Sequence, residues 1–295
     1  MAETLRINND TFKLNQGVEI PKIGLGTYKS GKGGEAYEAV KSALKNGYTH
    51  IDTAARYGNE EEIGKAIKDS GIPREKVFIT TKLWNVDHKN VEEALDTSLK
   101  KLKTEYIDLY LIHWPASIDP ETDEQYEDWN YVETYKELQK LKSNTDKIRA
   151  IGISNFTIKK LKTLLSDPEV NVMPAVNQIE AHPLLPQPEL YNYSKQKGIK
   201  IEAYSPLGSS GAPLFKNETI NEIADKNGVD SANVLISWAI QRDTVVLPKS
   251  VTEARIINNL KTFTLPAEDF RTLERLSEKY GVTRINDPAF NSFED

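Results

Sequence analysis

Four residues in the first half of the chain could together perform acid–base chemistry on a carbonyl group. Asp52, Lys82 and His113 each end an apolar stretch, and Tyr57 follows Asp52 by five positions. A phenol with its ordinary pKa of about 10 is a poor proton donor at neutral pH, but a nearby ammonium stabilises the phenolate and lowers that value. We therefore predict that Tyr57 donates a proton to a carbonyl oxygen and that Lys82 lowers its pKa.

The remaining two residues complete this predicted site. A partly buried lysine needs a counter-charge, which Asp52 supplies from the preceding strand. His113 would lie beside the substrate and direct a hydrogen bond to the oxygen where negative charge develops. Each residue alone also has an ordinary structural explanation, as a rim ion pair, a core tyrosine or a hydrogen-bonded core histidine. Their joint placement at three consecutive strand ends favours catalysis.

The elements that position these residues alternate along the chain. Short apolar or β-branched runs take turns with longer segments of helical period. The predicted strands cover residues 22–26, 49–52, 77–82, 107–113, 148–154, 175–180, 199–205 and 244–247. Predicted helices lie around residues 36–44, 60–69, 91–102, 129–141, 161–164, 190–193, 220–226, 232–241 and 254–260. Eight strand–helix units favour a closed (β/α)₈ TIM barrel over an open sheet, and strand ends in such a barrel meet at one mouth.

Two further segments flank the barrel. Residues 12–14 and 18–20 alternate at strand period around Asn15-Gln16-Gly17, which predicts an N-terminal β-hairpin that caps the fold. Residues 282–295 have no clear period and are expected to lie as a C-terminal loop over the mouth. No Ser- or Gly-rich break interrupts the chain, so we expect residues 1–295 to form a single domain.

Composition disfavours several other classes of protein. A net charge of -6 and a pI near 5.5 argue against a nucleic-acid partner. The absence of cysteine removes disulfides and thiolate ligands, and the four histidines show no metal-binding spacing. No signal-like segment or apolar run of ~20 residues is present, so we expect no membrane span and a cytoplasmic protein.

Two local patterns have ordinary structural explanations. The acidic run 119–128 is expected to be a solvated loop, and the P-x-x-P pattern in 183–186 is expected to be a rigid connection.

A glycine-rich segment supports a competing interpretation. Gly31-Lys32-Gly33-Gly34-Glu35-Ala36 matches the dinucleotide pattern G-x-G-x-x-A, and Asp52 follows Gly31 by 21 positions. In a Rossmann unit Asp52 would bind a ribose and Tyr57 would have no role. The preceding strand ends at Gly26, too far from the glycines for the tight Rossmann turn. The strand count and the other strand-end residues also remain unexplained, so the barrel is favoured.

A candidate phosphate site lies near the end of the predicted barrel. Lys249, Ser250 and Arg255 surround the start of a predicted helix. Helix N-termini with cationic side chains bind phosphate, and barrels often do so after their seventh and eighth strands. The alternative is ordinary helix capping by Ser250 or Thr252, with solvated charges on the other two residues.

Many short motifs follow one another in order along nearly the whole chain, and so many together are highly specific. They are Gly24-Leu25-Gly26-Thr27, His50-Ile51-Asp52-Thr53-Ala54 with Tyr57 and Gly58-Asn59-Glu60, Thr81-Lys82-Leu83-Trp84, Asp108-Leu109-Tyr110-Leu111-Ile112-His113-Trp114-Pro115, Ile151-Gly152-Ile153-Ser154-Asn155-Phe156, Asn177-Gln178-Ile179-Glu180, Ala203-Tyr204-Ser205-Pro206-Leu207-Gly208 and Pro248-Lys249-Ser250-Val251. In these motifs the chain resembles the aldo-keto reductases, in particular the fungal branch related to yeast glycerol dehydrogenase and carbonyl reductases.

The resemblance implies a barrel that binds NADPH and reduces a small carbonyl substrate to an alcohol, or in reverse oxidises an alcohol or polyol such as glycerol. Tyr57 would donate the proton, tuned by Lys82 and Asp52, while His113 orients the substrate. The cofactor-binding residues implied by position are Thr27, Asp52, Ser154, Asn155, Gln178, Tyr204, Ser205, Leu207, Ser209, Lys249, Ser250, Arg255 and Asn259. The substrate-binding residues implied are Tyr28, Tyr57, Trp84, His113 and Trp114.

Three positions depart from the pattern of this family. Tyr28 stands where many members have tryptophan, which alters a wall of the pocket. Asn258 stands where many have glutamate beside the adenine, whereas Asn259 fits. Residues 142–147 lack the usual glycine turn, so we expect a local change of the loop. Phe290 or Phe293 of the tail would also line the pocket.

A second hypothesis comes from a different functional class. The same barrel could serve as a non-catalytic subunit that binds NADP(H) and senses its redox state. The lack of a partner-binding extension disfavours this alternative. The chain is expected to be a monomer or a weak homodimer without a metal.

Overall fold

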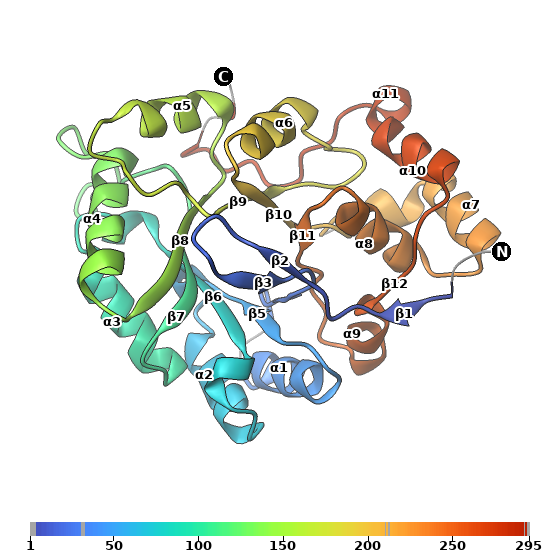
Figure 1. Cartoon of the computed structure of the whole chain (residues 1–295), viewed down its shortest axis with the longest axis horizontal. Coiled ribbons are helices and arrows are strands. Elements are labelled where there is room, and N and C mark those ends of the chain that lie inside the picture. Colours follow the sequence, from blue (N-terminus) through green and yellow to red (C-terminus); the bar gives the residue numbers. More distant parts are fainter. Residues whose placement is uncertain (1–3, 31–32, 210, 212, 292, 294–295) are drawn as a thin grey trace.

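The computed structural model describes residues 4–30, 33–209, 211, 213–291 and 293, and its centre is a ring of eight parallel strands (Figure 1). Each strand pairs with the next along the chain, from β4 to β11. Bridges from Ile23 to Val246 and from Gly26 to Lys249 close the ring, supported by the Gly24 amide donating to the Val246 carbonyl at 3.0 Å. The strands are β4 Leu25–Gly26, β5 His50–Asp52, β6 Phe78–Leu83, β7 Ile107–Ile112, β8 Ile148–Ser154, β9 Val176–Glu180, β10 Lys200–Tyr204 and β11 Val245–Val246. The predicted (β/α)₈ barrel is confirmed.

Helices surround the ring and cover the outer face of its strands (Figure 1). They are α1 Glu35–Lys45, α2 Glu60–Asp69, α3 Val91–Leu102, α4 Tyr131–Asn144, α5 Ile158–Ser166, α6 Pro188–Gln196, α7 Glu218–Asn227, α8 Ser231–Gln241, α9 Glu253–Asn259, α10 Ala267–Glu274 and α11 Leu276–Tyr280. The last two follow the ring and were not predicted, because Phe270, Leu273 and Leu276 provide only a short apolar pattern. A strand pair between β1 Arg6–Ile7 and β12 Lys261–Thr262 was also missed.

The alternation of side chains along each strand decides what the ring encloses. Successive strand residues face opposite sides, so residues two apart share a face. Ile51, Ile79 and Ile201 belong to the apolar cluster between strands and helices. Their neighbours on the opposite, inner face are polar near the carboxyl ends of the strands. These inner polar residues are His50, Asp52, Thr80, Lys82, Gln178 and Glu202, and all are buried.

The predicted N-terminal hairpin is confirmed and lies across the amino end of the ring (Figure 1). Its strands are β2 Thr11–Lys13 and β3 Glu19–Pro21. Leu14 and Ile20 are buried in an apolar cluster with the inner-face residues Leu109 and Leu111. In the turn, the side-chain nitrogen of Gln16 donates to the Ile151 carbonyl at 2.8 Å, and the side-chain oxygen of Gln16 accepts from the backbone amide of Ile151. The hairpin therefore closes one end of the ring.

The C-terminal tail, residues 282–291 and 293, runs over the opposite end, as expected. The Thr283 amide donates to the Leu184 carbonyl at 2.9 Å, and the Phe290 ring packs against Trp114. Leu184 belongs to the P-x-x-P segment, which is buried and turns back on itself through a bridge between His182 and Leu185. That segment is the rigid connection expected from the sequence.

Other local predictions have simple outcomes. In the segment 142–147, α4 continues to Asn144, and the Thr145 amide donates to the Leu141 carbonyl at the end of that helix. In the acidic loop, Asp128 is exposed and pairs with Lys89 at 2.8 Å.

The Rossmann interpretation is wrong because the sheet closes into a ring. Of its glycine motif, Gly31 and Lys32 lie outside the described residues.

No helix in the described part of the chain is both long and apolar enough to cross a membrane. Within the same residues, no group of three or more His, Asp or Glu side chains is arranged to hold a metal ion.

Candidate active site

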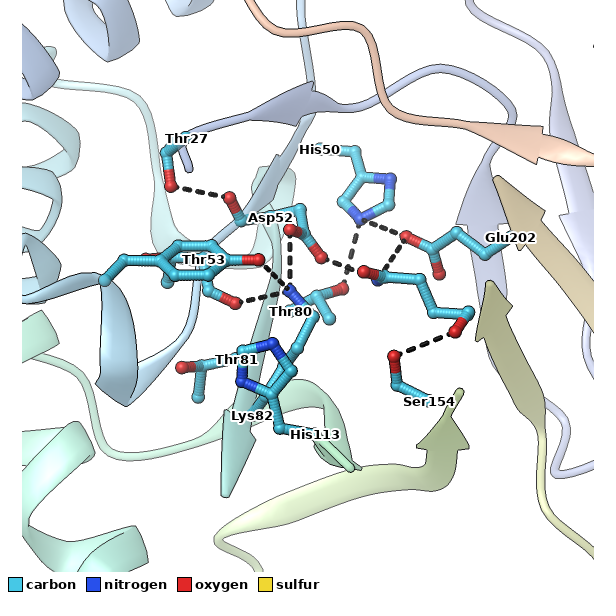
Figure 2. Close-up of polar contacts among 12 residues, drawn as sticks. Thr27, His50, Asp52, Thr53, Thr80, Thr81, Lys82, His113, Ser154 and Glu202 are labelled. Carbon is cyan, nitrogen blue, oxygen red and sulfur yellow. Dashed lines mark hydrogen bonds and ion pairs between the residues drawn. The ribbon is translucent and has the colours of Figure 1, made fainter. Parts of the chain in front are cut away.

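The predicted catalytic residues come together at the carboxyl end of the ring (Figure 2). The Lys82 ammonium donates to Asp52 Oδ1 at 2.8 Å, to the Thr53 carbonyl at 2.9 Å and to the Tyr57 hydroxyl at 3.2 Å. Lys82 is fully buried and Asp52 almost so, which gives the pair little contact with water. The ammonium thus has three oxygen acceptors, and one of them is the phenol.

A short turn after β5 positions Tyr57. Residues Ala55–Tyr57 form a 3₁₀ turn that ends at Gly58, whose φ of 70° is in the left-handed region favoured by glycine. The Asn59 side chain accepts from the Thr53 hydroxyl at 2.9 Å and donates to the Thr27 carbonyl at 2.9 Å. The Thr27 hydroxyl donates in turn to the Asp52 carbonyl at 2.8 Å. These contacts fix the turn against two neighbouring strands.

Burial and charge set the protonation of the lysine–tyrosine pair. Burial alone would lower the pKa of Lys82, but Asp52 and Tyr57 more than offset it, so that pKa lies above its ordinary value. Burial raises the pKa of Tyr57 to about 12, although the Lys82 ammonium acts in the opposite direction. The Lys82 charge thus lowers the pKa of Tyr57, as predicted, but the cost of burying a phenolate is larger, so the net pKa lies above its ordinary value. Tyr57 is protonated at neutral pH, as a proton donor must be.

His113 follows β7 and faces the same space. Its ring lies edge-on to the Tyr57 ring, with centroids 5.7 Å apart. Burial, followed by the charges of Lys82 and Arg56, holds the pKa of His113 well below its ordinary value, so the ring is neutral at pH 7. The His113 carbonyl accepts from the Asn155 side chain at 3.0 Å, and Nδ1 has no partner among the described residues. A neutral imidazole can donate a hydrogen bond without adding charge.

Aromatic rings surround Tyr57 and His113. The Tyr28 ring lies 5.1 Å from that of Tyr57, and the Trp84 ring lies 5.3 Å from that of His113. Trp114 is stacked near His113 at 6.3 Å. Both tail phenylalanines named from the sequence lie near this wall: the ring centroid of Trp114 is 5.4 Å from that of Phe290 and 6.0 Å from that of Phe293.

A buried polar layer behind the pair was not recognised in the sequence. The Gln178 side-chain nitrogen donates to Asp52 Oδ2 at 2.9 Å and lies 3.3 Å from Glu202 Oε1. His50 contacts the Thr80 hydroxyl at 3.1 Å and lies 4.0 Å from Glu202. Burial, followed by the Asp52 charge, raises the pKa of Glu202 well above its ordinary value. Acidic and imidazole side chains inside otherwise apolar strands were the available signal for this layer.

The residues expected to bind the nicotinamide are neighbours at the ends of β8, β9 and β10. The Ser154 hydroxyl donates to the Gln178 carbonyl at 2.8 Å, and the Tyr204 hydroxyl donates to Asn155 Oδ1 at 2.7 Å. Asn155 has a φ of 64°, a left-handed conformation that is uncommon outside glycine. Such local strain is typical of functional sites.

The residues expected to bind phosphates lie on two loops beyond β10 and β11. Ser205 and Ser209 also have left-handed backbones, with φ of 49° and 47°, and Leu207 between them is partly buried. Ser250 is buried, and its hydroxyl accepts from the Thr252 amide at 3.1 Å, a contact that precedes α9 and does not cap that helix. Asn259 is buried, while the Asn258 side chain is engaged by Asp230 at 2.7 Å.

These side chains suit the chemistry of NADPH. Lys249 and Arg255 are exposed, and neither forms a salt bridge within the part of the chain that the structure describes. Their charges are therefore available to a phosphate group, which guanidinium and ammonium groups bind well. Ser154, Asn155 and Gln178 offer a hydroxyl and two amides, which match the donor and acceptor of a carboxamide.

Comparison with known proteins agrees with this geometry. The chain is 48% identical to aldehyde reductase YPR1 of Saccharomyces cerevisiae, with 99% of each chain covered. It is 49% identical to glycerol 2-dehydrogenase (NADP(+)) of the same yeast, over 100% of this chain and 99% of that protein. The solved structure of a Bombyx mori aldo-keto reductase in complex with NADP has a TM-score of 0.87 at 34% identity and covers 96% of each chain. The sequence profile of the aldo/keto reductase family matches residues 22–278. The resemblance seen in the motifs is thus confirmed, and the chain belongs to the aldo/keto reductase family.

Proposed function

We propose that this protein is an NADPH-dependent oxidoreductase that reduces aldehydes or ketones to alcohols, with Tyr57 as the general acid. The observation that carries the proposal is the 3.2 Å contact between the Tyr57 hydroxyl and a Lys82 ammonium that is itself paired with Asp52 at 2.8 Å. A lone tyrosine or a lone ion pair is commonly structural, whereas a phenol in contact with a buried ion pair at the carboxyl end of a barrel supports a catalytic role.

Each catalytic side chain has a separate task. NADPH, when bound, supplies the hydride. Tyr57 donates its proton as negative charge develops on the carbonyl oxygen, and Lys82 stabilises the resulting phenolate. Asp52 keeps Lys82 charged in the buried ring. His113, neutral at pH 7, orients the carbonyl oxygen by hydrogen bonding.

The cofactor would extend across the mouth from β8 to α9. Ser154, Asn155 and Gln178 would hold the carboxamide, Tyr204 would stack on the nicotinamide, and Thr27 and Asp52 would also contact the cofactor. Ser205, Leu207 and Ser209 would line the pyrophosphate, Lys249, Ser250 and Arg255 would bind the 2′-phosphate, and Asn259 would contact the adenine. The relative named glycerol 2-dehydrogenase (NADP(+)) and the Bombyx mori complex with NADP support this choice of cofactor.

The substrate would be a small carbonyl compound held between aromatic walls. Tyr28, Trp84 and Trp114 surround Tyr57 and His113. Phe290 and Phe293 of the tail close the far side. The names of the two yeast relatives support aldehydes in the reducing direction and a polyol such as glycerol in the other.

A non-catalytic subunit that senses NADP(H) is the less favoured function. Such a subunit needs to bind the cofactor but does not need a proton donor. The complete arrangement of Tyr57, Lys82, Asp52 and His113 favours an enzyme.

The direct test is turnover. The protein is mixed with NADPH and a panel of activated aldehydes and ketones, and the loss of reduced cofactor is followed by absorbance; the reverse reaction uses NADP⁺ with polyols. We expect turnover on several carbonyls. Cofactor binding without turnover in either direction would instead favour the sensing subunit.

We further propose that residues 1–295 form one barrel domain that acts in the cytoplasm as a monomer or weak homodimer. The absence of a membrane-crossing helix from the described residues is compatible with this location. Sedimentation velocity over a range of concentrations measures the oligomeric state, and a stable higher oligomer would contradict it.

A further inference from the structure

Glu180, at the carboxyl end of β9, is a fully buried carboxylate that the proposed chemistry does not use. Its two oxygens accept from the Ile285 amide, the Asn286 amide and the Asn286 side chain, each at 2.8 Å. His182 Nε2 lies 2.9 Å from Oε1. A buried charge is costly unless it is hydrogen-bonded, and here most of the partners belong to one segment of the tail. The carboxylate therefore binds that segment specifically.

The bound segment leads directly into the substrate wall. A few residues beyond Asn286, the Phe290 ring contacts both Trp114 at 5.4 Å and Trp84 at 6.1 Å. Two amide donors in succession at Ile285 and Asn286 fix both the position and the direction of the chain as it enters this wall. The position of Phe290 over the mouth of the barrel thus depends on the Glu180 carboxylate of strand β9.

The same segment also contacts the loop assigned to the cofactor. The Asn286 side-chain nitrogen that donates to Glu180 lies 3.3 Å from the Ser205 hydroxyl. Ser205 begins the loop after β10, and its left-handed φ of 49° shows that this loop leaves the strand in a constrained conformation. The Asn286 side chain therefore connects the tail that carries Phe290, strand β9 of the barrel and the cofactor loop.

We propose that Glu180 is a positioning residue that, through Asn286, couples the substrate-binding tail to the cofactor loop at Ser205. The inference rests on the proposed function, because it assumes that Ser205 lies against the cofactor and Phe290 against the substrate. Coupling between two sites is reciprocal, so cofactor that orders Ser205 also orders the tail. Large aromatic substrates contact the aromatic wall of the pocket, so their binding depends on Glu180 more than the binding of small substrates does. Hydrogen bonds that favour the ionised form hold the pKa of Glu180 below its ordinary value despite burial, so it is charged at neutral pH.

Glu180→Gln tests the anchor itself. The amide keeps the shape but replaces one acceptor with a donor that faces the donors of Ile285 and Asn286. We expect the ratio of KM for a bulky aromatic aldehyde to KM for a small aliphatic aldehyde to rise about tenfold, the effect of one lost charge-assisted hydrogen bond. Amide hydrogen exchange in the tail should also become faster. A purely structural role would lower stability without changing the KM ratio.

A matched pair of tail variants tests the coupling. Asn286→Ala removes the side-chain contacts with Ser205 and with Glu180 Oε2 but leaves the backbone amides of Ile285 and Asn286 on Glu180. Asn291→Ala removes a different tail contact, the one from Lys160 at 2.9 Å, which does not involve the cofactor loop. In the wild type, NADP⁺ should slow exchange in the tail. We expect Asn286→Ala to lose most of this protection and Asn291→Ala to keep it.

The outcomes separate the inference from the function on which it rests. If the wild type binds NADP⁺ but turns over no carbonyl, the proposed function fails. If the wild type is active but Glu180→Gln leaves both the KM ratio and tail exchange unchanged, the positioning role is overturned. Equal NADP⁺ protection in both tail variants overturns the coupling, and that result is obtained even if Glu180→Gln does not fold.

Discussion

The two ends of the strand ring are built from opposite kinds of residue. At the amino end, Leu14 and Ile20 of the hairpin cover the inner-face residues Leu109 and Leu111 in an apolar cluster. At the carboxyl end, the inner face carries Asp52, Lys82, Gln178 and Glu202, all buried. The same strands thus provide a stabilising end and a chemically active end.

The difference shows where the fold tolerates unfavourable groups. Burying apolar surface stabilises the folded state by about 25 cal/mol per Å², whereas a buried polar atom without a partner is destabilising. Within the described residues, Glu202 Oε2 is a buried polar atom that lacks a hydrogen-bond partner. It lies behind the catalytic pair, so the active end contains an unfavourable buried group.

The largest expected effect concerns the active end. Tyr57→Phe removes the proton donor but leaves Lys82 paired with Asp52. We expect kcat to fall by about 10²–10⁴ while NADPH affinity, measured by fluorescence titration, changes little. Tyr110→Phe is the matched control, because its buried hydroxyl has no partner in the described structure and should not affect the rate. A Tyr57→Phe enzyme that keeps most of its rate would remove Tyr57 from the mechanism.

A truncation at the hairpin end should produce the reverse pattern. Leu14→Ala opens a cavity in the cluster that covers the amino end of the ring, where Leu14 is 3% exposed. We expect a loss of about 3 kcal/mol in the free energy of unfolding, measured in urea, with unchanged kcat. Ile7→Ala, at a side chain that is 53% exposed, should change stability by less than about 0.5 kcal/mol. A fall in kcat without a loss of stability would contradict the division between the two ends.

A smaller effect is expected at the rim of the active end. Arg255→Ala should weaken NADPH binding by about 1.5–3 kcal/mol, the cost of a lost charge-assisted contact. NADH, which lacks the 2′-phosphate, should bind the variant and the wild type equally well. Isothermal titration with both cofactors gives the comparison. Equal weakening for both would show that Arg255 does not bind the 2′-phosphate.

Near neutral pH, the smallest effect is expected for the pH dependence of stability. Burial lowers the pKa of His50 and of His88 to about 3, so both are neutral when folded. Between the unfolded pKa of 6.5 and the folded pKa of about 3, these histidines bind more protons in the unfolded chain than in the folded protein. Stability is therefore complete above the unfolded pKa and falls as the pH drops below it, by about 1 kcal/mol per pH unit for each histidine. Urea unfolding at several pH values should show a smaller slope for His88→Gln, and an unchanged slope would contradict this origin.

Much of the fold could be predicted because its signals are local. Apolar runs and helical periods repeat along the chain, and a parallel ring places consecutive strand ends side by side. Asp52, Lys82 and His113 could therefore be grouped before their distances were known. The pair of β1 with β12 and the helices α10 and α11 could not be predicted, since their short segments are stabilised by distant parts of the chain.

The parts of the site that were missed depend on three-dimensional surroundings. Whether the pKa of Tyr57 rises or falls is a balance between burial and the Lys82 charge, and burial cannot be measured from sequence. Glu202 and His50 lie inside predicted strands, but only their contact through Gln178 and Thr80 reveals a layer behind the catalytic pair. The contact of Glu180 with Asn286 joins a strand to a tail without any periodic pattern.

The closure of the ring between β4 and β11 has a consequence for folding kinetics. Every other strand pair in the ring joins elements that are consecutive in the chain, whereas the bridge from Ile23 to Val246 joins segments more than two hundred residues apart. Closing a long loop carries an entropy cost before contacts compensate for it, so this step is a natural barrier on the folding pathway. A circular permutant that links the two termini and opens the chain elsewhere would make this closure a local event and move the slow step to another pair of strands.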